Sequence, residues 1–444
     1  MTKAMSTAMR RIQTGNVLSA FGLGFTVPYL YVYVAQVRGL GSGTAGMVLA
    51  VFATAALVLL PFTGRAMDRR GPMPVLAGAA VCAAGGAVGL GFASSVLGAV
   101  AAAAVLGAAT AVIQPALATL IVWCSTPSTR TRAYATQFFL QNLGLGVGGL
   151  VGGQLVDTSR PRSFILLFCV EAAMFLVLAA IAGTVRLARP VPEAAGAAAG
   201  GGRGLRALLS HRAMVQLLVL AFVVFFACYG QFESGLTAYG TDAAGIDPSS
   251  LGVALAVNTA VIVVAQFLVL RFVERRRRTR VIALVGLVWA VAWLVAGYAG
   301  LAHAGQTAAT VAFVSTYGLF GLGEALLSPT VAPLVSDLAP SALVGQYNSA
   351  FALVKQLALA VGPAVGAPMA ARVHGPYIAT FVAFSLAVTV LALRLGKLLT
   401  PGQERPAATA PSRVVAQHLP EPLSGPGALP EQSVGPARVP ESVS

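Results

Sequence analysis

The chain has 444 residues, of which 57% are hydrophobic and only 10% are charged, and its mean hydropathy is +0.81. Soluble domains carry about 25% charged residues, so this composition excludes a water-facing surface over most of the molecule. The net charge of +15 would suit a nucleic-acid partner, but the basic residues lie in short loops between apolar runs, as the positive-inside rule describes. We therefore expect an integral membrane protein whose main partner is the lipid bilayer, with no nucleic acid bound.

Twelve apolar runs follow one another along the chain, and each is long enough to cross a bilayer as a helix of about 20 residues. They cover residues 15–37, 44–64, 74–94, 97–123, 134–156, 163–185, 213–239, 250–270, 281–303, 307–335, 347–370 and 377–393. The third and fourth runs are nearly continuous. The sequence thus predicts an all-α protein with twelve transmembrane helices, and the even number places both termini on one side.

The basic residues set the expected orientation. Twenty-four of the 29 Lys and Arg residues fall on the side of the termini, and Lys355 lies inside a predicted span. The remaining four fall on the opposite side, at Arg38, Arg160, Arg162 and Arg372. Because cytoplasmic loops carry the excess of basic residues, we expect a multi-pass protein of the cell membrane with both termini in the cytoplasm.

A stretch rich in Gly, Ala and Pro separates six predicted spans from the other six. Residues 189–212 contain the sequence PVPEAAGAAAGGGRG, which is typical of a flexible cytoplasmic linker. Residues 1–188 and 213–398 are then the two six-helix bundles. Residues 399–444 are rich in Pro, Ser and Glu without apolar periodicity, so we expect a disordered cytoplasmic tail.

The two halves repeat each other in sequence. RAMDRRG at 65–71 follows the second span, and RFVERRRR at 271–278 follows the eighth. GGLVGG at 148–153 lies in the fifth span, and GPAVGA at 362–367 lies in the eleventh. Duplicated six-helix halves are a transporter architecture, with a binding site near the middle of the membrane between them. We expect two pseudo-symmetric bundles.

Two of these motifs resemble a known family. GRAMDRRG at 64–71 is similar to the G-x-x-x-D-R-x-G loop signature of the major facilitator superfamily, and the resemblance covers roughly residues 10 to 398. NLGLGVGGLVGG at 142–153 resembles a helix motif of the drug:proton antiporters in that superfamily. Gly149 stands where that motif has Pro, and the fourth span lacks the basic residue usual in the group. The resemblance implies secondary transport by alternating access.

The loop signature implies a gate. In the resembled family its acid joins the two halves on the cytoplasmic side and holds the outward-facing state. Here Asp68 would contact the positive N-terminus of a facing helix that begins near Gly345. The expected gating loop comprises Gly64, Asp68, Arg69, Arg70 and Gly71. Its Arg residues also fix the topology, and the two roles can coexist.

Glycines in the fifth and eleventh spans predict close helix packing. The residues concerned are Gly144, Gly148, Gly152 and Gly153 in the fifth span, and Gly362, Pro363 and Gly366 in the eleventh. A glycine face lets a neighbouring helix approach closely, which suggests packing or bending between the halves. Packing of the kind found in any membrane helix is the alternative.

Charged side chains inside the predicted spans are the strongest mechanistic signal, because each costs about 2.5–3.5 kcal/mol at a helix centre. Glu233 and Glu324 lie on the seventh and tenth spans, which line the cavity in the resembled family, whereas Glu171 lies on the peripheral sixth. We expect Glu233 to carry a coupling proton, with solvation near the outer interface as its alternative role. Glu324 and Lys355 have matching depths, so they are candidates for coupling or for a buried ion pair.

Aromatic and amide side chains complete the expected substrate cavity: Tyr29, Tyr33, Gln114, Gln141, Asn142, Tyr229, Asn258 and Tyr317. Each of them is also suited to a hydrogen bond between helices. A mixed apolar and aromatic cavity with one or two acids favours bulky hydrophobic or cationic compounds over sugars.

Enzyme and metal motifs are missing from the sequence. It contains no H-E-x-x-H, P-loop or nucleophile elbow, and its four cysteines lack metal-site spacing. We expect a monomer without enzymatic activity, cofactor or metal. The first hypothesis is proton-coupled efflux of a lipophilic or cationic small molecule, as in multidrug efflux and antibiotic resistance. The alternatives are uptake of a metabolite by proton symport or facilitated diffusion, and a membrane sensor or scaffold.

Overall fold

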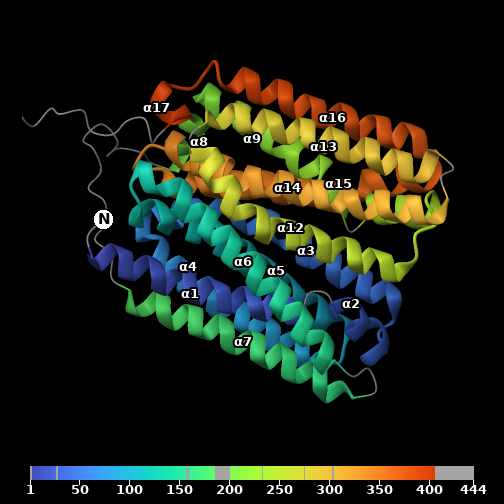
Figure 1. Ribbon diagram of the computed structural model, residues 1–444. Helices are drawn as coiled ribbons and strands as arrows, with labels where there is room; N and C mark the ends of the chain where they lie inside the picture. Colours follow the sequence, from blue (N-terminus) through green and yellow to red (C-terminus); the bar gives the residue numbers. More distant parts are fainter. Residues whose placement is uncertain are drawn as a thin grey trace, which may run out of the picture. The chain divides into compact units, whose positions relative to one another are not determined.

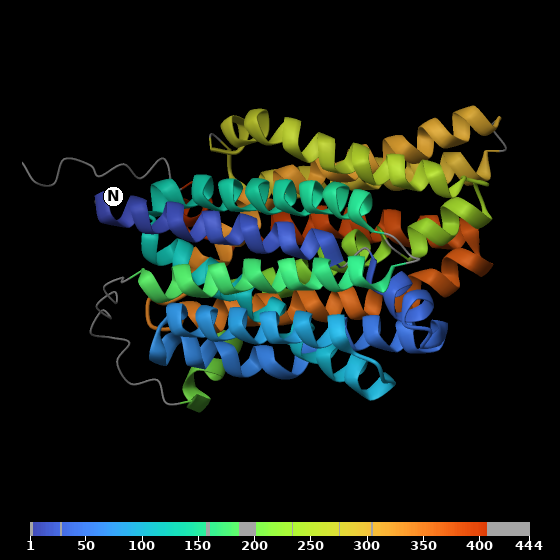
Figure 2. The same ribbon diagram turned by 90° about the horizontal axis from the view of Figure 1, so that it is seen from below.

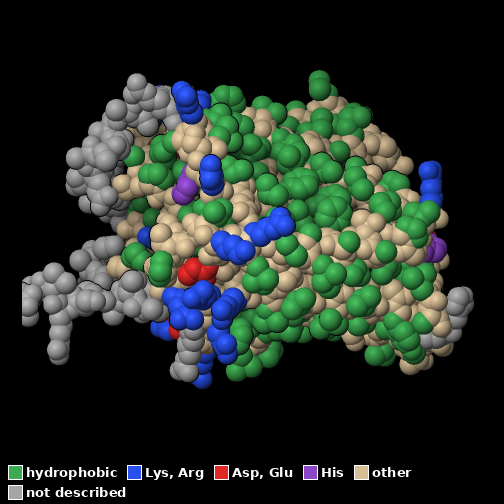
Figure 3. Space-filling view, turned by 90° about the horizontal axis from the view of Figure 1, so that it is seen from above, with side chains coloured by type: hydrophobic (Ala, Val, Ile, Leu, Met, Phe, Trp, Pro, Cys, Tyr) green, Lys and Arg blue, Asp and Glu red, His purple; other side chains and the backbone are tan. Residues whose placement is uncertain are grey.

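The computed structural model describes residues 3–26, 29–156, 160–185, 201–232, 234–274, 276–302 and 305–405. These ranges are almost entirely helical, and their long helices run side by side (Figures 1 and 2). On the face drawn in Figure 3, apolar side chains cover most of the surface and basic side chains gather toward one end. That distribution suits a protein surrounded by lipid.

The first half contains α1 (Lys3–Thr26), α2 (Leu30–Val32), η2 (Tyr33–Val37), α3 (Gly41–Arg70), α4 (Pro72–Phe92), α5 (Val96–Cys124), α6 (Pro127–Leu155) and α7 (Pro161–Thr184). The second half contains α9 (Arg212–Ala227), α10 (Tyr229–Phe232), α11 (Gly235–Asp242), α12 (Pro248–Glu274), α13 (Arg278–Leu301), α14 (Gln306–Leu338), α15 (Val344–Arg372) and α16 (His374–Leu395). The short helices α8 (Gly201–Ser210) and α17 (Pro401–Glu404) lie outside these bundles in the chain order.

Each predicted span coincides with one helix or one broken helix. Within the described ranges, 9 helical segments are long and apolar enough to cross a membrane, or 11 if each of two bent pairs is one span. The bent pairs are 7–26 with 30–37, at 46°, and 250–266 with 268–274, at 53°. α6 is the remaining long helix, and its polar first turns lower its hydropathy. The nearly continuous third and fourth runs separate at Ser95, whose hydroxyl accepts a hydrogen bond from the Gly98 N–H at 3.2 Å.

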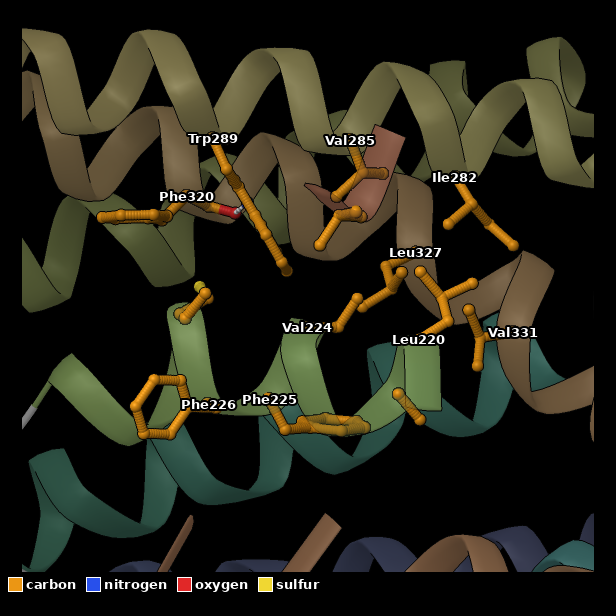
Figure 4. Close-up of a cluster of buried hydrophobic side chains, with 14 of the residues drawn as sticks. Leu220, Val224, Phe225, Phe226, Ile282, Val285, Trp289, Phe320, Leu327 and Val331 are labelled. Carbon is orange, nitrogen blue, oxygen red and sulfur yellow. Dashed lines mark hydrogen bonds between the residues drawn. The ribbon is translucent and has the colours of Figure 1, made fainter. Parts of the chain in front are cut away.

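Each half has its own hydrophobic core. In the first half α1 packs on α6 and α7, and α4 packs on α5 and α7; in the second, α13 packs on α14 and α16. Figure 4 shows the core of the second half, where Leu220 of α9, Trp289 of α13 and Phe320 of α14 lie among other buried side chains. α3 and α15 contact each other across the halves, as do α6 and α12.

The glycine face of α6 packs against α1. A Cβ atom added to Gly148 would meet the backbone of Phe21, and one added to Gly144 would lie 2.7 Å from the Val17 carbonyl oxygen. Gly152 and Gly153 likewise face Tyr29 of the broken first span. The expectation of packing between the halves was therefore wrong for α6, because these glycines contact α1, a helix of the same half.

The corresponding glycines of α15 pack against the broken seventh span. A Cβ atom added to Gly362 would lie 2.7 Å from the Cα atom of Gly230 in α10, and Gly366 faces the Gln231 side chain. Pro363 lies inside α15 between these contacts. Again the close approach occurs within one half.

A single methyl group at Gly148 is expected to destabilise the protein by about 1–3 kcal/mol, because it must push the α1 backbone away. Gly148→Ala should lower the melting temperature of the purified protein. Gly149→Ala is the matched control, since its added Cβ would lie 3.7 Å from the nearest atom, the Gly24 carbonyl oxygen. Equal melting temperatures for the two variants would contradict this role of Gly148.

The predicted linker and tail both contain ordered segments. Within the expected flexible linker, residues 201–210 form α8, in which Leu208 is buried. Residues 401–404 of the expected tail form α17, and the Thr279 hydroxyl donates a 2.5 Å hydrogen bond to the Glu404 carboxylate. Linker residues 189–200 and the tail from residue 406 lie outside the described residues.

Candidate functional site

A central cavity of about 170 Å³ lies where the two halves meet. α5 and α6 form its wall in the first half, and α9, α10, α14 and α15 form its wall in the second. Its polar lining residues are Gln114, Tyr134, Gln137, Gln141, Tyr229, Ser328, Asn348 and Lys355. The remaining lining is apolar and includes three phenylalanines, so the cavity suits a mainly apolar molecule with a few polar groups.

Three of the predicted cavity residues, Gln114, Gln141 and Tyr229, line this cavity together with Lys355. Gln114 and Gln141 lie on α5 and α6 of the first half, and Tyr229 and Lys355 lie on α10 and α15 of the second. A molecule bound there would therefore touch both halves. Whether these residues bind a substrate stays a prediction.

The placement of Tyr29, Tyr33 and Asn142 in the cavity was wrong. The cavity lining includes none of the described residues of the first span. Tyr29 donates to the Gly149 carbonyl at 2.8 Å, and Tyr33 is 1% exposed and donates to the Gly91 carbonyl at 2.5 Å. The Asn142 amide donates to the Phe138 carbonyl of its own helix at 2.9 Å.

Asn258 and Tyr317 also lie outside the cavity lining, as parts of a hydrogen-bond network around Glu324. The Asn258 amide donates to the Tyr317 carbonyl at 3.1 Å and to the Glu324 carboxylate at 3.0 Å. The Tyr317 hydroxyl donates to the Phe232 carbonyl at 3.0 Å. The expected substrate contacts are therefore helix–helix contacts that hold α10, α12 and α14 around one acid.

Glu324 is 4% exposed and lies behind the cavity wall. The Tyr229 side chain lies near its carboxylate, and because Tyr229 also lines the cavity, this side chain connects the acid to the cavity. Lys355 attracts the same carboxylate electrostatically, but its ammonium group lies 5.2 Å above the centre of the Phe225 ring. The two form no direct ion pair among the described residues, so the expected buried ion pair is replaced by an attraction at longer range.

Of the two other intramembrane acids, the structure describes Glu171 but not Glu233. Glu233, the expected proton carrier, lies outside the described residues, so its role stays a prediction. Glu171 is fully buried where α7 packs against Gly22 of α1, away from the cavity. Its peripheral position agrees with its place on the sixth span.

The gating loop makes the contact that its motif implied. Asp68 accepts hydrogen bonds from the Gly345 N–H at 2.7 Å and from the Gln346 N–H at 3.1 Å, at the first turn of α15. The Gln346 side chain donates to the same carboxylate at 3.0 Å. Gly64 lets the helices approach, because a Cβ atom there would lie 2.7 Å from the Gln346 Cα atom. Gly71 ends α3 with a φ of 87°, and Arg69 and Arg70 are exposed beside it.

A second inter-half contact, which the sequence did not predict, surrounds Asp337 near the end of α14. Its carboxylate pairs with Arg130 of α6 and, at 2.5 Å, with Arg278 of α13. Arg278 also donates to the Thr131 hydroxyl at 3.2 Å, and both guanidinium groups are buried. Arg130 and Arg278 belong to the 24 basic residues that set the expected orientation, and the sequence signal for this contact is an isolated acid at the end of the tenth apolar run.

Neutralising Asp68 is expected to weaken the closure of this end of the protein. Asp68→Asn keeps one acceptor oxygen but loses the charge that faces the α15 N-terminus, an interaction worth about 0.3–1 kcal/mol or more when partly buried. Substrate transport should fall several-fold while the amount of inserted protein stays near normal. Wild-type transport by Asp68→Asn would leave the loop with a topological role only.

Comparisons with known proteins agree with this architecture. The model of the Major Facilitator Superfamily matches residues 14–363 and 242–426. The multidrug resistance protein MdtG of Klebsiella pneumoniae (strain 342) is 31% identical over 174 residues, which are 38% of this chain and 41% of that protein. The match thus spans less than half the length of this relative.

Solved transporters share the fold at low sequence identity. The transporter FucP in its outward conformation has a TM-score of 0.72 at 14% identity, covering 88% of this chain and 99% of its own. The human organic anion transporter TETRAN has a TM-score of 0.69 at 15% identity, covering 90% and 100%. These likenesses confirm the predicted all-α membrane fold of twelve helices in two bundles. With the family model matching most of its length, this chain belongs to the Major Facilitator Superfamily.

Proposed function

We propose that the protein moves a lipophilic small molecule across the membrane by alternating access, driven by a proton gradient. The observation that carries the proposal is one cavity lined by both halves, beside an end where Asp68 and Asp337 hold the halves together. A rocking motion that breaks these contacts would expose the cavity to the other side. The closed end is proposed to be cytoplasmic, with both termini on that side of the cell membrane and the protein acting as a monomer.

Proton coupling is assigned to Glu324. A buried carboxyl held between helices can bind and release a proton when its surroundings change during transport. Glu324 meets this condition because it lies between moving parts: the Asn258 amide of α12 donates to its carboxylate, and Lys355 of α15 attracts it at longer range. Glu233 remains a second candidate.

Two directions of transport have support. Export is the first candidate, because the partial relative is a multidrug resistance protein. Uptake together with a proton is the second: the charged residue in the described part of the cavity lining is Lys355, which is an unsuitable neighbour for a cationic drug and so does not favour multidrug export. A sensor or scaffold role would require that neither movement occurs.

Reconstituted liposomes test the proposal. The purified protein would be inserted into vesicles with an imposed pH gradient of either sign, and a panel of lipophilic cations, acids and neutral dyes would be followed. We expect accumulation against a concentration gradient for at least one class, abolished by a protonophore. Movement that is never driven uphill would contradict proton coupling, and no movement at all would contradict transport.

A further inference from the structure

We infer that the central cavity binds a small lipophilic anion, whose acidic group pairs with Lys355 and contacts Gln137. The inference rests on the proposed function, because it names the substrate class of the same cavity. It revises the expectation from sequence, which favoured hydrophobic or cationic compounds on the basis of intramembrane acids.

The charge on the cavity wall is positive. Lys355 is the charged residue among the described lining side chains, and Glu324 is not one of them. An ammonium group has three donors, and in the described part of the chain none is used in a hydrogen bond or ion pair with a protein acceptor. The Phe225 ring below it stabilises the charge without occupying these donors. A carboxylate entering the cavity would find a cation free to bind it.

Gln137 supplies a second polar group on the opposite wall. Its side chain is 7% exposed and lines the cavity from α6, while both its amide nitrogen and its amide oxygen have no hydrogen-bond partner among the described residues. Leaving a buried amide unpaired is unfavourable, so a bound group that accepts its N–H would recover part of that loss. Gln137 and Lys355 come from different halves, so one acidic group would connect them.

The rest of the lining selects an apolar body of limited size. Phe138, Phe225 and Phe351 are among the lining residues, together with aliphatic side chains. The volume of about 170 Å³ is comparable to an engineered cavity of roughly 150 Å³ that binds benzene. A single aromatic ring bearing an acidic group fits both the volume and the polar contacts.

Glu324 adjusts the strength of this binding. Its carboxylate attracts the Lys355 ammonium group and so competes with a bound anion. Protonation of Glu324 removes the competitor, which means that a proton and the anion favour each other's binding. Joint binding favours co-transport, and therefore the uptake alternative, under an inward proton gradient.

Binding to the purified full-length protein in detergent tests the inference without any gradient, so its outcome is independent of whether proton-driven transport occurs. The probes are phenylacetate, its neutral isostere phenylacetamide, and the cation phenethylammonium, measured by isothermal titration. Wild type should bind phenylacetate most tightly. Lys355→Gln should lower phenylacetate affinity about tenfold or more, the size expected for a hydrogen bond to a charged group. Glu324→Gln should raise it.

The opposite signs separate electrostatics from structural damage, because damage would lower the affinity in both variants. Arg372→Gln is the matched control: it removes a cation from the exposed end of the same helix, α15, and should leave the affinity unchanged. Tighter binding of phenethylammonium by wild type would overturn the inference. So would unchanged phenylacetate affinity in Lys355→Gln, or a fall in both Lys355→Gln and Glu324→Gln.

Discussion

Glu324→Gln is expected to reduce transport driven by a pH gradient to the background rate while leaving downhill exchange measurable. The glutamine keeps the size of the side chain and can still accept the Asn258 hydrogen bond, but it cannot take up or release a proton. A carrier fixed in a state that resembles the protonated one can still exchange substrate between its two faces. Uphill accumulation and counterflow in the same liposome preparation are the two measurements.

Glu171→Gln is the matched control for this prediction. Glu171 is also a fully buried carboxyl in a membrane helix, but it packs between α7 and α1 rather than beside the cavity. Uphill transport should survive in that variant. If it survives in Glu324→Gln as well, the coupling proton is carried elsewhere, and Glu233 is the next candidate. If both variants lose it, buried acids in this protein matter for structure rather than for coupling.

Asp337→Asn should give the largest loss of stability among the inter-half contacts. Removing one partner of a buried ion pair typically costs about 3–5 kcal/mol, and here it leaves two buried guanidinium groups without their shared carboxylate. The repulsion between Arg130 and Arg278 should push α6 away from α13 and α14. We expect a lower melting temperature and a longer distance between spin labels at Ser128 and Ser341, with the native cysteines replaced.

The exposed pair between Arg132 and Glu274 provides the comparison. Its atoms are 3.3 Å apart, but the Arg132 side chain is 70% exposed, so solvent screens the attraction. Glu274→Gln should change the free energy of unfolding by about 0–1 kcal/mol. If Asp337→Asn is as mild as Glu274→Gln, the buried cluster does not hold the halves together.

The sequence predicted the helices well because each apolar run has to match the thickness of the bilayer. It also predicted the partner of Asp68, since the loop motif placed one acid at one end of the molecule opposite the start of α15. The first prediction rests on a local pattern, and the second rests on the resemblance of the loop motif to a known family.

The cavity was harder to predict because it depends on how helices turn and bend. Tyr33 lies on the first predicted span, yet the 46° bend between residues 7–26 and 30–37 places it among Phe164 and Phe168 of α7. The Asp337 cluster joins residues that are 207 and 59 positions apart, and single-sequence patterns carry no information on such pairs. From sequence alone, a basic residue at the end of a span that only sets the orientation cannot be distinguished from one that forms a buried ion pair in the packed structure.

The docked position of α17 bears on where the protein can be shortened. The Gln403 carbonyl accepts a hydrogen bond from Arg278 at 3.3 Å, and the Glu404 carboxylate accepts one from Thr279. A truncation at residue 399, the boundary that composition suggested, would remove both acceptors. Arg278 and Thr279 of α13 would then lose these hydrogen bonds, and Arg278 also pairs with Asp337. A truncation after Arg405 would spare them. Tags and fusion partners are therefore best attached beyond residue 405, where these bonds stay intact.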